Sequence, residues 1–144
     1  MTDAAPAVPK HLWIVGVLSL LWNAVGAWDY LMTQTQNAAY MGSFTQPQLD
    51  FFYGLPTWVV ALWATAVWGG VLGSLLLLAR KRVATTVFLV SLVCAVLVGI
   101  QNFALSNGFE VMGTGGAAFS AVIVVVAFLL WRYAEKVQRL GVLR

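Results

Sequence analysis

Two long apolar runs separated by three consecutive cations constrain this chain more than any other feature of its sequence. The runs cover residues 55–79 and 83–105, and the turn between them is Arg80-Lys81-Arg82. Each run is long enough to cross a bilayer as a helix of about 20 residues. Three adjacent cations are costly in hydrocarbon, so we expect the turn to lie at a membrane surface. Because the turn is short, the two helices are predicted to be antiparallel neighbours.

Composition extends this conclusion to the whole chain. Of its 144 residues, 61% are hydrophobic and only 9% are charged, whereas a soluble domain carries about 25% charged residues. Two further apolar runs, at residues 12–32 and 115–133, complete a set of four spans. The first run is too long, and too rich in tryptophan, for a cleaved secretory signal. The sequence therefore predicts an all-α integral membrane protein with one domain of four transmembrane helices.

The charges predict the orientation of these spans. All eight lysines and arginines fall on one side of the layout, whereas Asp29, Asp50 and Glu110 fall on or near the other. Cytoplasmic loops carry the excess of basic residues, so both termini are predicted to be cytoplasmic. Glu135 is placed to pair with Arg139 along the last helix. The cations expected to contact lipid headgroups are Arg80, Lys81, Arg82, Arg132, Lys136 and Arg139.

The polar stretch between the first two spans carries the signature of a short helix. Thr45 is a good N-cap residue, and Gln48 stands three positions later, where it would complete a capping box. Pro47 is tolerated in a first helical turn. The helix would carry the aromatic cluster of residues 51–53 and end at Gly54. We expect it to lie in the headgroup region of the outer surface.

Rows of small residues at helical spacing mark where the spans are expected to touch. In lipid, helices associate by close backbone packing, because burying apolar surface gains nothing there. The rows predict a compact four-helix bundle. The adjacent glycines at 69 and 70 point to two neighbouring faces, which leaves room for a partner as well as for packing within the chain. The glycines expected at helix contacts are Gly16, Gly69, Gly70, Gly73 and Gly99.

Five polar residues are candidates for one pocket that opens to the outer surface: Asn23, Asp29, Gln101, Asn102 and Glu110. At about 1.5 Å of rise per residue, Asn23 falls near the midplane of the bilayer and the other span residues near its outer interface. An ionisable residue inside a membrane suggests a functional site. Two plainer interpretations stay open, in which Asp29 reaches the headgroups and Asn23 forms an interhelical hydrogen bond.

Three tryptophans, Trp22, Trp63 and Trp68, fall inside the predicted bilayer and away from its interfaces. Indole rings stack well on sugars and other rings, so these residues would suit the lining of a ligand cleft. The alternative is that they fill space opposite glycines in the bundle.

The sequence shows no catalytic constellation. A single histidine, His11, and a single cysteine, Cys94, cannot build a haem or metal site with the few carboxylates. No nucleophile motif or phosphate-binding loop is present. The cations form no run longer than three and do not alternate with aromatic residues, so we expect no nucleic-acid partner. The prediction is a protein without enzymatic activity, cofactor or bound metal.

Three segments carry a resemblance to known proteins: Leu21-Trp22-Asn23 with Gly26, then Pro56-Thr57-Trp58, then residues 68–82. They resemble a family of small four-span inner-membrane proteins of proteobacteria, whose members are often labelled "sugar transporter". The resemblance covers nearly the whole chain, through packing motifs that carry little chemistry. It implies a location in the bacterial inner membrane and a carbohydrate substrate, and it supplies no functional residues.

Two functions from different classes follow. The main prediction is a non-catalytic accessory or interaction subunit, because the chain has more small-residue faces than one bundle core uses. Its expected partners are lipid, further copies of the chain, or other membrane protein subunits. The alternative is a small oligomeric transporter for a polar solute, for which the resemblance implies a sugar. Alternating access usually needs two repeats around a midplane site, so a transporter of this size would need a dimer.

Overall fold

The computed structural model describes Ala4 and residues 6–144, and this part of the chain contains helices and no strand. Two short helices, α2 (Ala38–Met41) and α3 (Gln46–Tyr53), follow the first long one. Four helices are long and apolar enough to cross a membrane, which confirms the predicted all-helical, four-span class. They are α1 (Lys10–Gln34), α4 (Thr57–Leu78), α5 (Val83–Phe103) and α6 (Gly108–Arg139).

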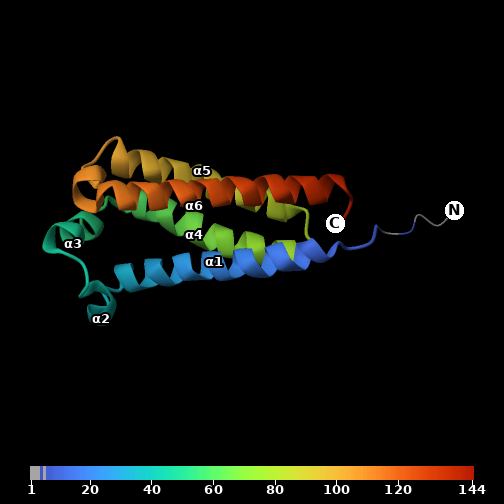
Figure 1. Ribbon diagram of the computed structural model, residues 1–144, viewed down its shortest axis with the longest axis horizontal. Coiled ribbons are helices and arrows are strands. Elements are labelled where there is room, and N and C mark those ends of the chain that lie inside the picture. The colour runs from blue at the N-terminus through green and yellow to red at the C-terminus, as the bar shows by residue number, and fades with distance from the viewer. Residues whose placement is uncertain (1–3, 5) are drawn as a thin grey trace.

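The bundle has two unlike ends (Figure 1). At one of them α2 and α3 connect α1 to α4, and we call this the loop end. At the opposite end, the start of α1, the α4–α5 turn and the C-terminal residues come together. All of the cations proposed above for headgroup contact, at residues 80–82 and 132–139, lie in the turn and the last turns of α6 that form this basic end.

The first three long helices follow their predicted spans closely, and the fourth does not. The span predicted at 115–133 is part of a helix that begins at Gly108 and ends at Arg139. The helical conformation is interrupted at Gly113, whose φ of 68° and ψ of −172° lie outside the helical region. Only glycine adopts this conformation readily. Gly113 therefore joins a short first segment to the main part of α6 where the sequence suggested only a loop.

The helices pack in chain order, α1 on α4, α4 on α5 and α5 on α6. A Cβ atom at Gly73 would lie 2.8 Å from the ring of Phe88, so this glycine lets α5 approach α4 closely. Gly69 faces Ser91 of α5 in the same way, at 3.3 Å. The neighbouring Gly70 faces α1 instead. Both faces of the glycine pair are thus used inside the chain.

Two more of the predicted contact glycines behave differently from one another. Gly16 of α1 lies directly against the side chain of Leu78 on α4, as its small-residue row suggested. Gly99 of α5 has no atom within 4 Å of the position where a Cβ would stand. Its predicted packing role is therefore not seen within this chain.

The basic end contains the main hydrophobic core, to which all four long helices contribute. The C-terminal residues that contribute to this core are held against the α4–α5 turn by two backbone hydrogen bonds. The Arg144 amide donates to the Arg80 carbonyl at 2.8 Å, and the Arg82 amide donates to the Arg144 carbonyl at 3.0 Å. The only ion pair in the described residues joins Arg132 to Glu135 at 2.7 Å. The predicted pairing of Glu135 with Arg139 is wrong, because Glu135 reaches the cation one turn before it rather than one turn after. Core residues are Leu12, Leu77, Ala84, Phe88, Leu130, Ala134, Val137, Val142 and Leu143.

The loop end confirms the predicted capping box. The Thr45 hydroxyl accepts from the Gln48 amide at 3.4 Å, the Gln48 side chain accepts from the Thr45 amide at 3.0 Å, and α3 ends at Gly54. Helix α2 was not predicted, although Asn37 is a standard N-cap residue and accepts from the Tyr40 amide at 3.1 Å. These two helices carry the chain across the end of the bundle, from α1 toward α6.

Candidate functional site

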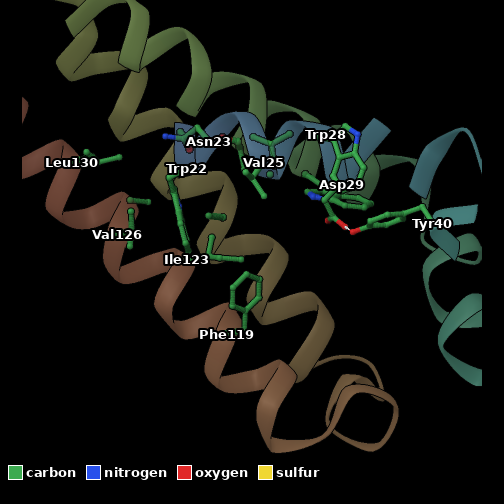
Figure 2. Close-up of a pocket in the computed structure, with 17 residues that line it drawn as sticks. Trp22, Asn23, Val25, Trp28, Asp29, Tyr40, Phe119, Ile123, Val126 and Leu130 are labelled. Carbon is green, nitrogen blue, oxygen red and sulfur yellow. Dashed lines mark hydrogen bonds between the residues drawn. The ribbon is translucent and has the colours of Figure 1, made fainter. Parts of the chain in front are cut away.

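A cavity of about 270 Å³ lies between α1 and α6, the first and last spans of the bundle. These two helices are not among the pairs that pack extensively, so a gap is left between them. Residues of α4 and α5, including Trp63 and Ser91, form the back of the cavity. Figure 2 shows Trp22 of α1 directed toward α6, where Phe119 and Ile123 lie, and Trp28 beside Asp29 near Tyr40.

Two hydrogen bonds outside the cavity tie α6 to other helices near the two ends of the bundle. At the basic end, His11 of α1 and Tyr133 of α6 are hydrogen bonded at 2.5 Å. At the loop end, the Gln48 side chain of α3 donates to the Val111 carbonyl of α6 at 3.4 Å. Between these contacts several side chains that line the cavity are exposed, with 65% exposure for Val25. In a bilayer this opening faces the lipid.

Trp22 is the side chain that comes nearest to bridging the opening. It extends from α1 toward α6 (Figure 2), and its ring centroid lies 6.2 Å from that of Phe119. The two rings narrow the opening without a hydrogen bond or an ion pair across it. The opening is therefore one that rotation of a few side chains would widen.

The end of the cavity nearest to α2 carries its only ionisable groups, Asp29 and Tyr40. The Tyr40 hydroxyl donates a hydrogen bond to the Asp29 carboxylate (Figure 2). The Tyr40 ring also packs edge-on against Trp28, with centroids 4.8 Å apart. Trp63 also lines the cavity, and its ring centroid lies 5.0 Å from that of Tyr30. Tyr40 thus links the Asp29 carboxylate to the ring of Trp28.

The environment of Tyr40 changes its acidity. Burial, followed by the hydrogen bond to Asp29 and the charge of that carboxylate, raises the pKa of Tyr40 to about 12 from its ordinary 10.0. Because the folded-state pKa is the higher one, the stability from this contact is fully present below pH 10 and is lost as the pH rises through about 12.

We expect the near-ultraviolet phenolate absorbance of the wild type, after subtraction of a Tyr40→Phe titration, to show a step near pH 12. The matched control is Tyr53→Phe, which removes an exposed tyrosine of α3 that takes no part in the contact. A Tyr40 step at the ordinary pKa of a free phenol would show that the contact with Asp29 does not form in solution.

Asn23 lies deeper along the same wall and forms the interhelical bond that was its plainer interpretation. Its side-chain amide donates to the Ser19 carbonyl at 2.8 Å and to the Ser74 hydroxyl of α4 at 3.4 Å. The Ser74 hydroxyl in turn donates to the Gly70 carbonyl at 2.8 Å. Asn23 also borders the cavity, but its amide hydrogens are already used in holding α1 on α4.

The structure brings together only part of the predicted polar pocket. Asn23 and Asp29 line the cavity, whereas Gln101, Asn102 and Glu110 do not. Gln101 donates to the Ser106 hydroxyl at 3.1 Å, and Glu110 is exposed in the first turn of α6. The side-chain oxygen of Asn102 is buried and has no hydrogen-bond partner in the described residues. Equal depth in the membrane did not bring these groups together, because α1 and α5 pack on different faces of α4.

The aromatic predictions divide in the same way. Trp22 and Trp63 line the cavity, and Trp68 points out of the bundle with 42% exposure. Sequence reasoning missed two lining residues, Trp28 near the end of α1 and Tyr40 in the polar stretch. The one available signal for Tyr40 was the capping residue Asn37, which predicts a helical turn at that position.

No protein-family model, no curated protein and no solved structure matches this chain. The resemblance to small four-span inner-membrane proteins therefore stays a prediction. No group of three or more metal-binding side chains occurs in the part of the chain that the structure describes. Fold and site together define an all-helical protein with four helices that could span a membrane and a cavity between the first and the last of them.

Proposed function

We propose that this protein is a non-catalytic bacterial inner-membrane protein that binds a lipid-soluble small molecule in the α1–α6 cleft and carries it within or across the bilayer. The observation that carries this proposal is the cavity between α1 and α6, which is lined by exposed apolar side chains of both helices. A molecule that enters from the side comes from the lipid. The proposal keeps the transport alternative and replaces its polar solute by an amphiphile.

The orientation belongs to the same proposal. The excess of cations at the basic end favours its placement in the cytoplasm, together with both termini. The loop end then lies at the outer surface, with α3 in the headgroup region, where its aromatic residues 51–53 are partly exposed. Asp29, in the last third of α1, would lie just below the outer headgroups.

The test is to fill the cavity from within. Ala127 lines it from α6, whereas Ala121, on the same helix, is exposed and does not. The wild type and the variants Ala127→Trp and Ala121→Trp would be extracted with native lipid, and their small molecules would be identified by mass spectrometry. We expect the wild type and Ala121→Trp to retain a molecule that Ala127→Trp has lost, with similar thermal unfolding midpoints for all three proteins.

Two results would contradict the proposal. One is a wild type that carries nothing beyond the lipids found with an unrelated membrane protein. The other is equal retention by both tryptophan variants, which would place the molecule outside the cleft.

The accessory-subunit function keeps one observation in its favour. A second, wholly apolar groove lies between α5 and α6, lined by residues that include Val96 and Val125, and α5 also carries the uncontacted Gly99. The other glycines predicted at helix contacts, Gly16, Gly69, Gly70 and Gly73, meet side chains of the chain itself. The mass of the natively extracted particle separates the two functions: other chains in fixed ratio favour a subunit, and copies of this chain alone favour a carrier.

A further inference from the structure

We infer that the ligand of the α1–α6 cleft is an organic cation with an apolar body, held at Asp29 inside the ring of aromatic side chains. This inference rests on the proposed function and names the class of molecule that the same cleft would bind. It follows from the charge of the site, from the rings around it, and from the scarcity of free polar groups elsewhere in the cavity.

The charge of Asp29 has no cationic partner within the described residues. The single ion pair there is at the basic end, between Arg132 and Glu135. The chain's other cations lie at the same end, and Lys10 is about 28 Å from Asp29 along α1. Only one carboxylate oxygen of Asp29 accepts a hydrogen bond, from Tyr40, and the second accepts none. A carboxylate at the edge of an apolar cavity is stabilised by a positive charge that binds beside it.

The surrounding rings favour an organic cation over a metal ion. Trp28, Trp63 and Tyr40 line the same cavity as Asp29, and Tyr40 contacts both Trp28 and the Asp29 carboxylate. Aromatic faces attract cations within about 6 Å, and the attraction is stronger for Trp than for Tyr. Quaternary and alkylated ammonium groups are recognised in this way. A hard metal cation would need several oxygen ligands, and this end of the cavity offers one carboxylate and one phenol.

The polar groups of the cavity argue against a sugar. The Asn23 amide is bonded to Ser19 and Ser74, and the Ser91 hydroxyl donates to the Ala66 carbonyl at 2.6 Å. The Tyr40 hydroxyl is bonded to Asp29. A sugar would bring many hydroxyl groups into a cavity with few free partners, and each unpaired group is costly. The wall from Phe119 to Leu130 is instead suited to an alkyl or aryl body.

The experiment measures binding of dodecyltrimethylammonium to the protein in phosphatidylcholine nanodiscs, with empty nanodiscs as the blank. A neutral hydrocarbon of the same shape, with carbon in place of the quaternary nitrogen, is measured beside it. We expect the cation to bind the wild type about tenfold more tightly than Asp29→Asn, while the neutral analogue binds both equally. Asn at position 29 still accepts from the Tyr40 hydroxyl, so the variant keeps the fold of this end.

Asp50→Asn is the matched control. Asp50 is an exposed carboxylate at the same end of the bundle, bonded to Gln46 and outside the cavity. The Asp50→Asn change removes one negative charge from the same end of the bundle without altering the cavity. The affinity of this variant for the cation should therefore equal that of the wild type. An equal loss in both variants would show a general attraction to the surface and would overturn the inference.

The outcome also separates this inference from the proposed function. If Ala127→Trp loses its native molecule but the cation and its neutral analogue bind alike, the cleft holds a neutral lipid and only the cation assignment fails. If neither probe binds and a protein helix occupies the cleft in the extracted particle, both proposals fail together.

Discussion

Gly70→Leu is expected to lower the free energy of unfolding by about 3 kcal/mol, the largest effect of any substitution considered for this chain. A Cβ at Gly70 would coincide with the side-chain amide of Asn23, which is itself held by Ser19 and Ser74. The side chain cannot enter unless α1 moves away from α4 and the buried amide loses its partners. The measurement is the unfolding midpoint in a mild detergent titrated with a denaturing one.

Gly99→Leu provides the comparison. It makes the same change on a helix of the same bundle, at a glycine with no atom within 4 Å of its Cβ position. We expect it to leave the midpoint unchanged or to raise it slightly, because leucine is the better helix former. Asn23→Ala combined with Gly70→Leu should restore part of the lost stability, since it removes the group that collides. Equal midpoints for the two leucine variants would mean that α1 does not pack on α4 as described.

These glycines also show how far the sequence alone could reach. The apolar runs predicted all four spans, because no other structure accommodates such runs with so few charges. Small residues at helical spacing identified faces for packing, and Gly16, Gly70 and Gly73 do lie at contacts. The pattern could not say which helix would fill each face. It left open a partner at Gly70, where the structure has Asn23 of the same chain.

The sequence predicted how deep each residue of the candidate site lies in the membrane, but not toward which neighbouring helix its side chain points. The rise of a helix places Asp29 and Gln101 at similar depth, and depth was the only coordinate that the sequence supplied. The rotation of each helix about its axis depends on which neighbours it packs against. Because α4 separates α1 from α5, Asp29 faces α6 and Tyr40 instead of Gln101. Tyr40 carried no periodic signal of its own, since α2 is only four residues long.

Gly113→Ala is expected to cost about 2 kcal/mol, the second largest effect, through backbone conformation alone. The φ of 68° and ψ of −172° at Gly113 are accessible to glycine and strained for any residue with a Cβ. No atom lies within 4 Å of the position where that Cβ would stand, so steric conflict with a neighbour contributes nothing. The same unfolding titration measures this cost.

Gly115→Ala isolates the cause. This residue lies two positions further along α6, has no positive φ, and is equally free of neighbours within 4 Å. Alanine there should stabilise the helix by about 0.5 to 1 kcal/mol. The opposite signs of the two changes would show that the break at Gly113 is real, and a similar small gain in both would mean that α6 runs straight. A straight helix would redirect residues 108–112, including Val111, whose carbonyl accepts a hydrogen bond from Gln48 of α3. The contact between α3 and α6 at the loop end therefore depends on one glycine that lies outside the cavity.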